Sequence, residues 1–292
     1  MIRLIFPHIA LFLANTIYAV NYLFAKDVMP NYITPTGFIL LRVLSAALIF
    51  YLIHSFFIKE KLHKQDILYI LICAIFGIVI NMLCFFEGLN LTNPINASLI
   101  MITTPLIVYV LSLVFKKEAH QYRKLIGVIL GLLGATLLIT DGVFNFRINN
   151  LGDVLVLLNA ISYGIYLILI KSMMEKYHPI TVLKNLFLLG LIILIPIGWP
   201  DLNQINFSEM PVDIVLKVLF VLLFTTCGAY FLNIYAISKV SASTVAFYIY
   251  LQPLLATTLA VILKKDILTE IKLVSAFFIF LGVYFVIKRD TT

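Results

Sequence analysis

Long apolar runs separated by short polar or proline-containing breaks dominate the pattern of this chain. A transmembrane helix needs about 20 mostly apolar residues, and ten segments approach that length. These segments are Leu4–Phe24, Gly37–Phe57, Ile67–Phe86, Ile95–Phe115, Leu125–Thr140, Leu151–Met173, Val182–Trp199, Ile214–Ala236, Ala242–Leu263 and Ile271–Ile287. The longest break, Pro200–Asp213, is too short to hold a second folded domain. The pattern therefore predicts an all-α integral membrane protein with ten transmembrane helices.

Composition supports this class and excludes others. Hydrophobic residues make up 62% of the 292 positions and charged residues 12%, whereas soluble domains carry about 25% charged residues, so a water-soluble globular protein is excluded. The net charge of +7 would suggest a nucleic-acid partner in a soluble protein. Here the cations lie between the apolar runs, and we expect no nucleic-acid binding. Cys73, Cys84 and Cys227 lie inside apolar runs without metal-ligand spacing, so we expect packing residues and no metal or cofactor.

Lysine and arginine positions predict the orientation of the chain, because they accumulate in cytoplasmic connections. With the N-terminus inside, the inside segments hold 14 Lys and Arg and the outside segments hold 6, with Arg42 left out as intramembrane. The first half of the chain provides most of this bias. We therefore expect a multi-pass protein of the cytoplasmic (inner) membrane with both termini in the cytoplasm.

The chain resembles itself at an offset of 145–148 residues. Tyr18–Lys26 aligns with Tyr163–Lys171, and each copy has an aromatic-small pair in mid-helix and a terminal lysine. Thr104–Glu118 aligns with Gln252–Asp266, and each copy has a proline and a charged end. Five helices per copy is an odd number, so the second copy crosses the membrane in the opposite direction. We therefore expect two inverted five-helix repeats.

Polar side chains inside the predicted helices are candidates for a binding site, because in hydrocarbon such groups need a partner or a water-filled cavity. Tyr18, Asn21 and Tyr22 share one face of the first helix, and the sixth helix repeats the arrangement. The candidate substrate-binding residues are Tyr18, Asn21, Tyr22, Asn81, Asn159, Tyr163, Tyr166, Tyr230, Asn233, Tyr248 and Gln252. The alternative is that these residues form interhelical hydrogen bonds that only hold the bundle together.

Two backbone features in the predicted helices each have two interpretations. Pro105 and Pro253 lie at matched positions of the repeats, where a proline frees a carbonyl for a ligand or a hinge, unless each is a packed kink. The Gly127-x-x-x-Gly131 motif permits close helix approach within the protomer or, alternatively, a dimer contact. We expect a monomer or a weak homodimer.

Two charged residues lie within or near the ends of the predicted helices. Arg42, near the start of the second helix, is expected to snorkel to the outer interface. Otherwise it faces the bundle and attracts a carboxylate. Glu87 lies close to the outer surface and is a candidate for proton coupling, or a solvated or capping residue.

Two stretches of the chain together form a pattern that resembles a known family. The matching features are Tyr18-Ala19, Asn21, Phe24, Lys26, Pro35 and Arg42, and then Asn96-Ala97-Ser98, Pro105, Lys116-Lys117-Glu118, Gly127 and Gly134. The pattern resembles the EamA family of the drug/metabolite transporter superfamily, with a first EamA repeat at 1–140 and a second at 151–288. The resemblance implies a central cavity lined mainly by helices 1, 3, 4, 6, 8 and 9, with helices 5 and 10 peripheral. It also implies export of amino acids, metabolites or drugs, with some members importing. The usual aromatic-glycine pair of helix 1 is replaced here by Tyr18-Ala19.

The sequence thus favours a secondary transporter that exports amino acids or similar small metabolites by alternating access. Neutral or zwitterionic solutes are favoured over cationic drugs, because the polar stripes contain Tyr and Asn but no buried acid. A channel or a non-transporting scaffold is the alternative, and neither would require matching stripes in both halves. A membrane-embedded enzyme is not expected, since the chain has no HExxH, GxSxG or Walker A motif. The expected partners are a small-molecule substrate and the lipid bilayer.

Overall fold

The computed structural model describes residues 2–92, 94–142, 151–262 and 267–287, which form helices joined by short turns. The elements are α1 (Ile2–Val28), α2 (Pro35–Phe57), η1 (Lys64–Asp66), α3 (Ile67–Ala74), η2 (Ile75–Val79), α4 (Ile80–Leu91), α5 (Pro94–Met101), α6 (Thr104–Val114), α7 (Tyr122–Thr140), α8 (Leu151–Met174), α9 (Pro179–Leu202), η3 (Phe207–Glu209), α10 (Val212–Phe220), η4 (Val221–Gly228), α11 (Ala229–Ile237), α12 (Ala242–Phe247), η5 (Tyr248–Tyr250), α13 (Leu251–Ile262) and α14 (Glu270–Ile287). Elements that follow one another end to end form ten rods, one for each predicted segment. Lys264, Lys265 and Asp266, on which the repeat alignment partly rests, lie outside the described residues, as does position 288 at the end of the second predicted repeat.

Nine helical stretches of the described chain are long and apolar enough to cross a membrane. The tenth rod, α14, covers the last predicted segment and is not among these nine. Large apolar side chains point outward from the bundle; for example, Phe12, Leu133 and Phe277 are 46%, 51% and 62% exposed. Apolar side chains on the outside suit contact with lipid. Helical rods are also compatible with lipid, because a helix makes its backbone hydrogen bonds within itself. The protein is an all-helical, multi-pass membrane protein.

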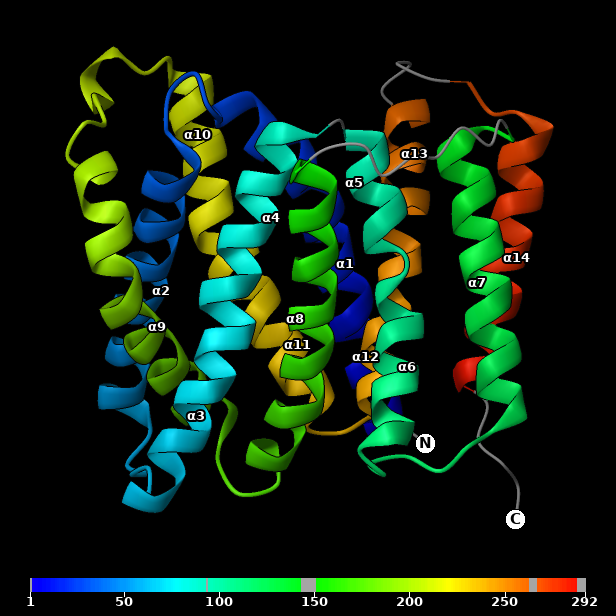
Figure 1. The fold of residues 1–292 in the computed structure, drawn as a ribbon, viewed down its shortest axis with the longest axis horizontal. Helices are drawn as coiled ribbons and strands as arrows, with labels where there is room; N and C mark the ends of the chain where they lie inside the picture. The colour runs from blue at the N-terminus through cyan, green and yellow to red at the C-terminus, as the bar shows by residue number, and fades with distance from the viewer. Residues whose placement is uncertain (1, 93, 143–150, 263–266, 288–292) are drawn as a thin grey trace.

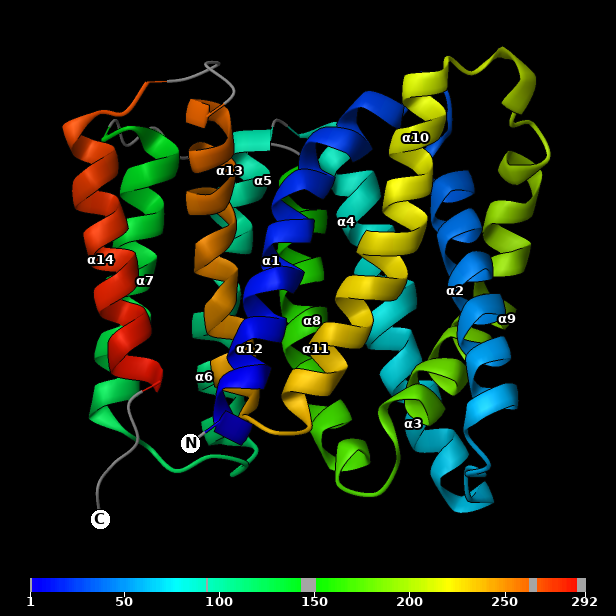
Figure 2. The same cartoon turned by 180° about the vertical axis from the view of Figure 1, so that it is seen from behind.

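The rods stand side by side, with α7 and α14 at one edge of the bundle and α2 and α9 at the other (Figures 1 and 2). Between these edges lie α1, α4, α8 and α11 (Figure 2). Helix α1 begins and α14 ends on the same side of the bundle (Figure 1). We call this side, marked by Ile2 and Ile287, the terminal side, and the opposite one the far side.

Glycines bring α7 and α14 into close backbone contact at their edge of the bundle. A Cβ atom on Gly127 would lie 2.8 Å from the carbonyl oxygen of Gly282, and one on Gly282 would lie 2.7 Å from the oxygen of Gly127. A Cβ on Gly131 would lie 2.4 Å from the ring of Tyr250. The Gly127-x-x-x-Gly131 motif therefore packs helices within the protomer.

Four of the ten rods are interrupted near their middle, and the interruptions match between the two halves of the chain. The third and eighth rods contain the π-helical segments η2 and η4, which correspond at an offset of 148 residues. The fourth rod has a turn at Ile102–Thr103, and the ninth has the 3₁₀ segment η5. Pro105 and Pro253 each lie in the first turn of the helix that follows, where a missing N–H leaves no helical bond unmade. The helix thus breaks before each proline.

Candidate functional site

A cavity of about 100 Å³ lies among the central rods. A single buried water needs about 10–15 Å³, so the cavity has room for several waters or for a small solute. Its walls come from α1, α2, α4, α5, α8, η4, α11, α12, η5 and α13. Both halves of the chain therefore contribute to it.

Nine of the eleven candidate residues lie together around this cavity. They are Tyr18, Asn21, Tyr22, Asn81, Asn159, Tyr163, Tyr230, Asn233 and Gln252. The other described lining residues are Asn15, Arg42, Met82, Phe85, Phe86, Met101, Thr225, Val245 and Ile249. Asn15 precedes Tyr18 by one helical turn, and that spacing would have indicated it. The apolar members resemble ordinary core residues in the sequence, so no sequence signal marks them.

Two candidates lie elsewhere. The ring of Tyr166 packs over Gly77, since a Cβ on Gly77 would lie 2.3 Å from Tyr166 Cδ2. Tyr248 Oη is 2.8 Å from Nδ1 of His8 and hydrogen-bonds to it. Each tyrosine shares a helical stripe with a lining residue, Tyr166 with Tyr163 and Tyr248 with Gln252, but its own side chain contacts another rod. The structure therefore does not bring them to the cavity wall.

Amide side chains in the wall tie neighbouring rods together. The bonds run from Asn159 Nδ2 to Asn81 O at 2.7 Å, from Asn233 Nδ2 to Tyr18 Oη at 3.1 Å, and from Gln252 Nε2 to Asn15 Oδ1 at 2.8 Å. These bonds use amide N–H groups. The Oδ1 atoms of Asn21 and Asn159 are buried and have no hydrogen-bond partner within the described chain. The wall thus keeps unused acceptors.

The π-helical segments form part of the cavity's support. A π-helical turn shifts the backbone hydrogen-bond register, and such turns are frequent at functional sites. Ser162 Oγ donates to Phe76 O at 2.6 Å, and Tyr230 Oη donates to Gly77 O at 3.3 Å. Carbonyls of η2 are therefore bound by side chains from α8 and α11, which belong to the second half of the chain.

Arg42 does not snorkel, so that expectation is wrong. The residue is only 3% exposed and lines the cavity. Its Nε donates to Thr226 Oγ1 at 2.9 Å, and the guanidinium carbon lies 4.5 Å from the centre of the Phe86 ring. Thr226 itself donates to Val221 O across the π-helical turn of η4, at 2.9 Å. This hydroxyl and the aromatic ring hold the cation inside the bundle. Glu87, the coupling candidate, is not among the lining residues.

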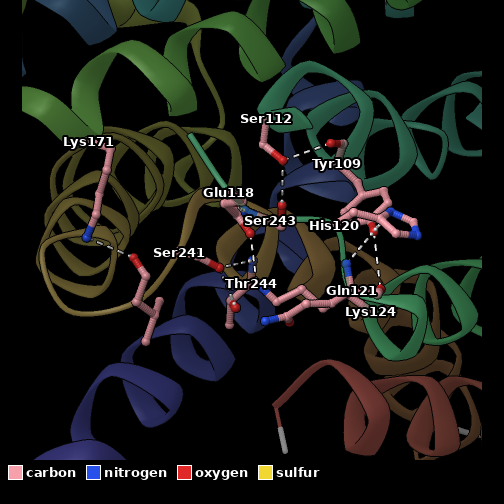
Figure 3. A network of polar contacts seen from close by, with 11 residues as sticks. Tyr109, Ser112, Glu118, His120, Gln121, Lys124, Lys171, Ser241, Ser243 and Thr244 are labelled. Atoms are coloured by element: carbon pink, nitrogen blue, oxygen red, sulfur yellow. Dashed lines mark hydrogen bonds and ion pairs between the residues drawn. The ribbon is translucent and has the colours of Figure 1, made fainter. Parts of the chain in front are cut away.

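A polar network lies on the terminal side of the bundle (Figure 3). The carboxylate of Glu118 accepts from the Ser243 backbone N–H at 3.1 Å and from Lys124 Nζ at 2.7 Å. Lys171 Nζ donates to the carbonyls of Ile237 at 2.7 Å and Val240 at 3.1 Å. These bonds connect the α6–α7 turn with α7 and α12, and the end of α8 with the end of α11 and the α11–α12 turn. In the sequence, Lys171 is part of the repeat alignment, and Glu118 is part of both that alignment and the EamA-like pattern.

A smaller surface link lies on the same side, between the start of the third rod and the α8–α9 turn. Asp66 accepts from Lys176 Nζ at 2.9 Å and from Tyr177 Oη at 2.6 Å. The hydrogen bond to Asp66 raises the pKa of Lys176. Lys176 therefore stays charged at neutral pH and forms an ion pair with Asp66.

The far side has a counterpart of the Lys171 contact. Lys26, at the end of α1, donates from Nζ to Leu89 O near the end of α4, at 3.3 Å. Lys26 corresponds to Lys171 at an offset of 145 residues, and Leu89 to Ile237 at an offset of 148. Each lysine thus caps the C-terminal turn of a helix, a position where a cation is favourable. The two contacts lie at opposite ends of the bundle (Figure 1).

The comparisons with known proteins identify the family. The sequence pattern of the EamA-like transporter family matches residues 5–140 and again residues 150–288. The chain belongs to the EamA-like transporter family. The resemblance to this family, part of the drug/metabolite transporter superfamily, is thereby confirmed. It is a membrane transporter family, which implies transport without enzymatic conversion.

Relatives share this class over most of their length. An uncharacterized transporter of Archaeoglobus fulgidus is 28% identical over 264 residues, which are 87% of each protein. The uncharacterized transporter YyaM of Bacillus subtilis is 24% identical over 229 residues, covering 77% of this chain and 74% of YyaM. A crystal structure with 16% sequence identity has a TM-score of 0.77 and covers 96% of both chains, which shows a shared fold.

Proposed function

We propose that this EamA protein is a secondary transporter that exports amino acids or similar small metabolites across the cytoplasmic membrane by alternating access. The observation that carries the proposal is the central cavity, whose neutral tyrosine and asparagine groups come from both halves of the chain. A small, mostly preformed cavity with a few polar groups is typical of a solute site. On this proposal the nine candidates at the cavity, from Tyr18 to Gln252, contact the substrate.

The proposal includes two inverted repeats, at 1–140 and 151–288, with both termini in the cytoplasm. The lysine contacts at the two ends of the bundle support it, because an inverted copy of one capping contact falls on the opposite side of the membrane. Lys171 makes two bonds of 2.7 and 3.1 Å on the terminal side, whereas Lys26 makes one of 3.3 Å on the far side. We assign this conformation to the state whose cytoplasmic side is closed.

The matched helix interruptions support a moving part in each half. We propose that the rods bend at Ile102–Thr103 and at η5, with Pro105 and Pro253 marking the hinges. The backbone leaves the regular α-helical bond pattern at Thr103 and in η5, and a proline has no N–H to bond, so a small rotation of the following helix loses few hydrogen bonds. Each hinge would serve one side of the membrane.

Flux in proteoliposomes tests the proposed function. A transporter gives saturable uptake of a labelled amino acid and accelerated exchange when the other side is loaded with the same solute. A channel gives flux without exchange, and a scaffold gives none. Either result would overturn the proposal.

Substitutions in the cavity wall distinguish substrate contacts from interhelical support. Asn21→Ala and Tyr163→Ala are expected to lower flux per folded molecule while thermal stability stays near that of the unmodified protein. Tyr51→Ala is the control, because Tyr51 is 51% exposed on the outside of α2. If the two cavity variants lose folded protein and keep normal flux per molecule, these residues only support the bundle.

A further inference from the structure

Arg42 is the one charged side chain among the described residues that line the cavity. It forms no ion pair within the described chain; its Nε contacts a neutral hydroxyl, and its guanidinium carbon lies 4.5 and 6.0 Å from the ring centres of Phe86 and Phe38. A hydroxyl and two rings compensate a buried cation only in part. The cavity wall therefore carries one positive charge that the protein does not neutralise.

The contacts of Arg42 leave one edge of its guanidinium group for a ligand. Thr226 Oγ1 accepts the hydrogen bond from Nε, and the Phe86 ring lies against one face of the guanidinium group. The Nη1 atom is buried and has no hydrogen-bond partner within the described chain. Two Nη groups on one edge fit the two oxygens of a carboxylate through parallel hydrogen bonds. The geometry thus favours an anion of that shape.

Unused acceptors elsewhere in the wall indicate the second group of the ligand. Asn21 Oδ1 and Asn159 Oδ1 are buried and unpartnered in the described chain, and both residues line the cavity. An amide oxygen accepts hydrogen bonds from an ammonium group but not from a carboxylate. The wall therefore offers donors for an anion and acceptors for a cation, with no charged acid to bind a simple amine.

We propose that Arg42 binds the carboxylate of the transported solute and that the oxygens of Asn21 and Asn159 accept from its ammonium group. This inference rests on the proposed transport function and narrows it to zwitterionic amino acids. Thr226 is a positioning residue, because it holds Nε and leaves the Nη edge for the substrate. Amines, sugars and amino-acid amides lack the group that Arg42 recognises.

Counterflow competition in proteoliposomes tests this assignment. The probes are L-leucine, L-phenylalanine and L-threonine, each compared with its C-terminal amide and its decarboxylated amine, and sodium chloride and sodium acetate as simple anions. In the unmodified protein each amide is expected to compete about 10- to 100-fold more weakly than its acid, as for loss of a hydrogen-bonded charge. Arg42→Gln is expected to weaken the acid by a similar factor and bring the acid-to-amide ratio near one.

Two further variants separate recognition from folding. Lys217→Gln is the control, because Lys217 binds Asp27 and Asp213 and does not line the cavity, and it should keep the full acid preference. Thermal unfolding without solute should show Arg42→Gln to be at least as stable as the unmodified protein, since removing an uncompensated buried charge relieves its desolvation. If Arg42→Gln does not fold, Arg42→Lys decides, and its acid preference should fall because lysine lacks the paired donors.

Each outcome decides one claim. Equal competition by acid and amide in the unmodified protein overturns the role of Arg42 but leaves transport standing. A full acid preference in folded Arg42→Gln, or in Arg42→Lys where Arg42→Gln does not fold, overturns it as well. Competition by chloride or acetate as strong as that by the amino acids shows a general anion site and overturns amino-acid recognition. Absence of saturable flux for every amino acid overturns the proposed function, and this inference with it.

Discussion

Lys171→Met removes the ammonium group that ties the end of α8 to the end of α11 and keeps the apolar stem of the side chain. In the structure this group donates to Ile237 O at 2.7 Å and to Val240 O at 3.1 Å. Ile237 is the last residue of the eighth rod and Val240 lies in the α11–α12 turn that follows it, and this rod lines the cavity through Tyr230 and Asn233. We therefore expect the substitution to destabilise the closed state of the terminal side.

The size of the effect follows from the two bonds. Hydrogen bonds to charged groups contribute about 1.5–3 kcal/mol each, so two bonds at the low end give about 3 kcal/mol. That free energy corresponds to about a 100-fold change in the ratio of closed to open states. Water can bind the freed carbonyls at the membrane edge and recovers part of it, so we expect a shift of about 10- to 100-fold. Lys26→Met removes a single bond of 3.3 Å, and its shift should be smaller and in the opposite direction.

Cysteine labelling measures this shift from each side of the membrane. Ile249→Cys, at the cavity wall, is introduced into a protein in which Cys73, Cys84 and Cys227 are replaced by serine. A membrane-impermeant methanethiosulfonate is applied to inside-out and right-side-out vesicles. With Lys171→Met the labelling rate should rise in inside-out vesicles and fall in right-side-out vesicles.

The matched control is Lys239→Met, because Lys239 lies in the α11–α12 turn beside these carbonyls and is exposed. It should leave both labelling rates unchanged. Equal effects of Lys171→Met and Lys239→Met would show that loss of surface charge, rather than loss of the two bonds, causes the change. Shifts in the same direction for Lys171→Met and Lys26→Met would refute the proposal that the two lysine contacts stabilise closure of opposite sides of the membrane.

Three further predictions use the same protein. Pro105→Ala and Pro253→Ala should change cavity labelling from opposite sides, whereas similar small changes in both would indicate packed kinks. Gly127→Val should lower the melting temperature, since its side chain would meet the backbone of α14 and overpacking costs about 1–3 kcal/mol, while flux per folded molecule stays normal. Reporter fusions in the Lys59–Asp66 connection should be cytoplasmic and those in Pro200–Asp213 periplasmic, and reversed locations would overturn the orientation.

The ten rods could be predicted from the sequence because the thickness of the bilayer fixes the length of each apolar run. Each apolar run must span about 30 Å of hydrocarbon, and the predicted Leu151–Met173 and observed α8, Leu151–Met174, differ by one residue. Helix periodicity also placed Tyr18, Asn21 and Tyr22 on one face, and that face lines the cavity. These features depend on local rules that composition and spacing express directly.

Other features depend on contacts between distant segments, and spacing could not reveal them. Tyr166 shares a helical stripe with Tyr163, yet it packs on Gly77 of another rod. Arg42 turns inward because Thr226, 184 positions later in the chain, accepts from its Nε. The π-helical segments have an ordinary apolar composition, so only the backbone shows them.

The paired lysine contacts suggest how two related halves would give a transporter with two states of similar free energy. If the halves are inverted repeats, the Lys26–Leu89 and Lys171–Ile237 contacts are copies of one interaction on opposite sides of the membrane. When one side closes and the other opens, one lysine contact forms and its copy breaks. The free energies of the two states therefore stay close. In the structure the copies differ, with two bonds at one end and a longer single bond at the other. A small difference between balanced states is what a bound solute can reverse, because a ligand shifts the equilibrium only by its difference in affinity for the two states.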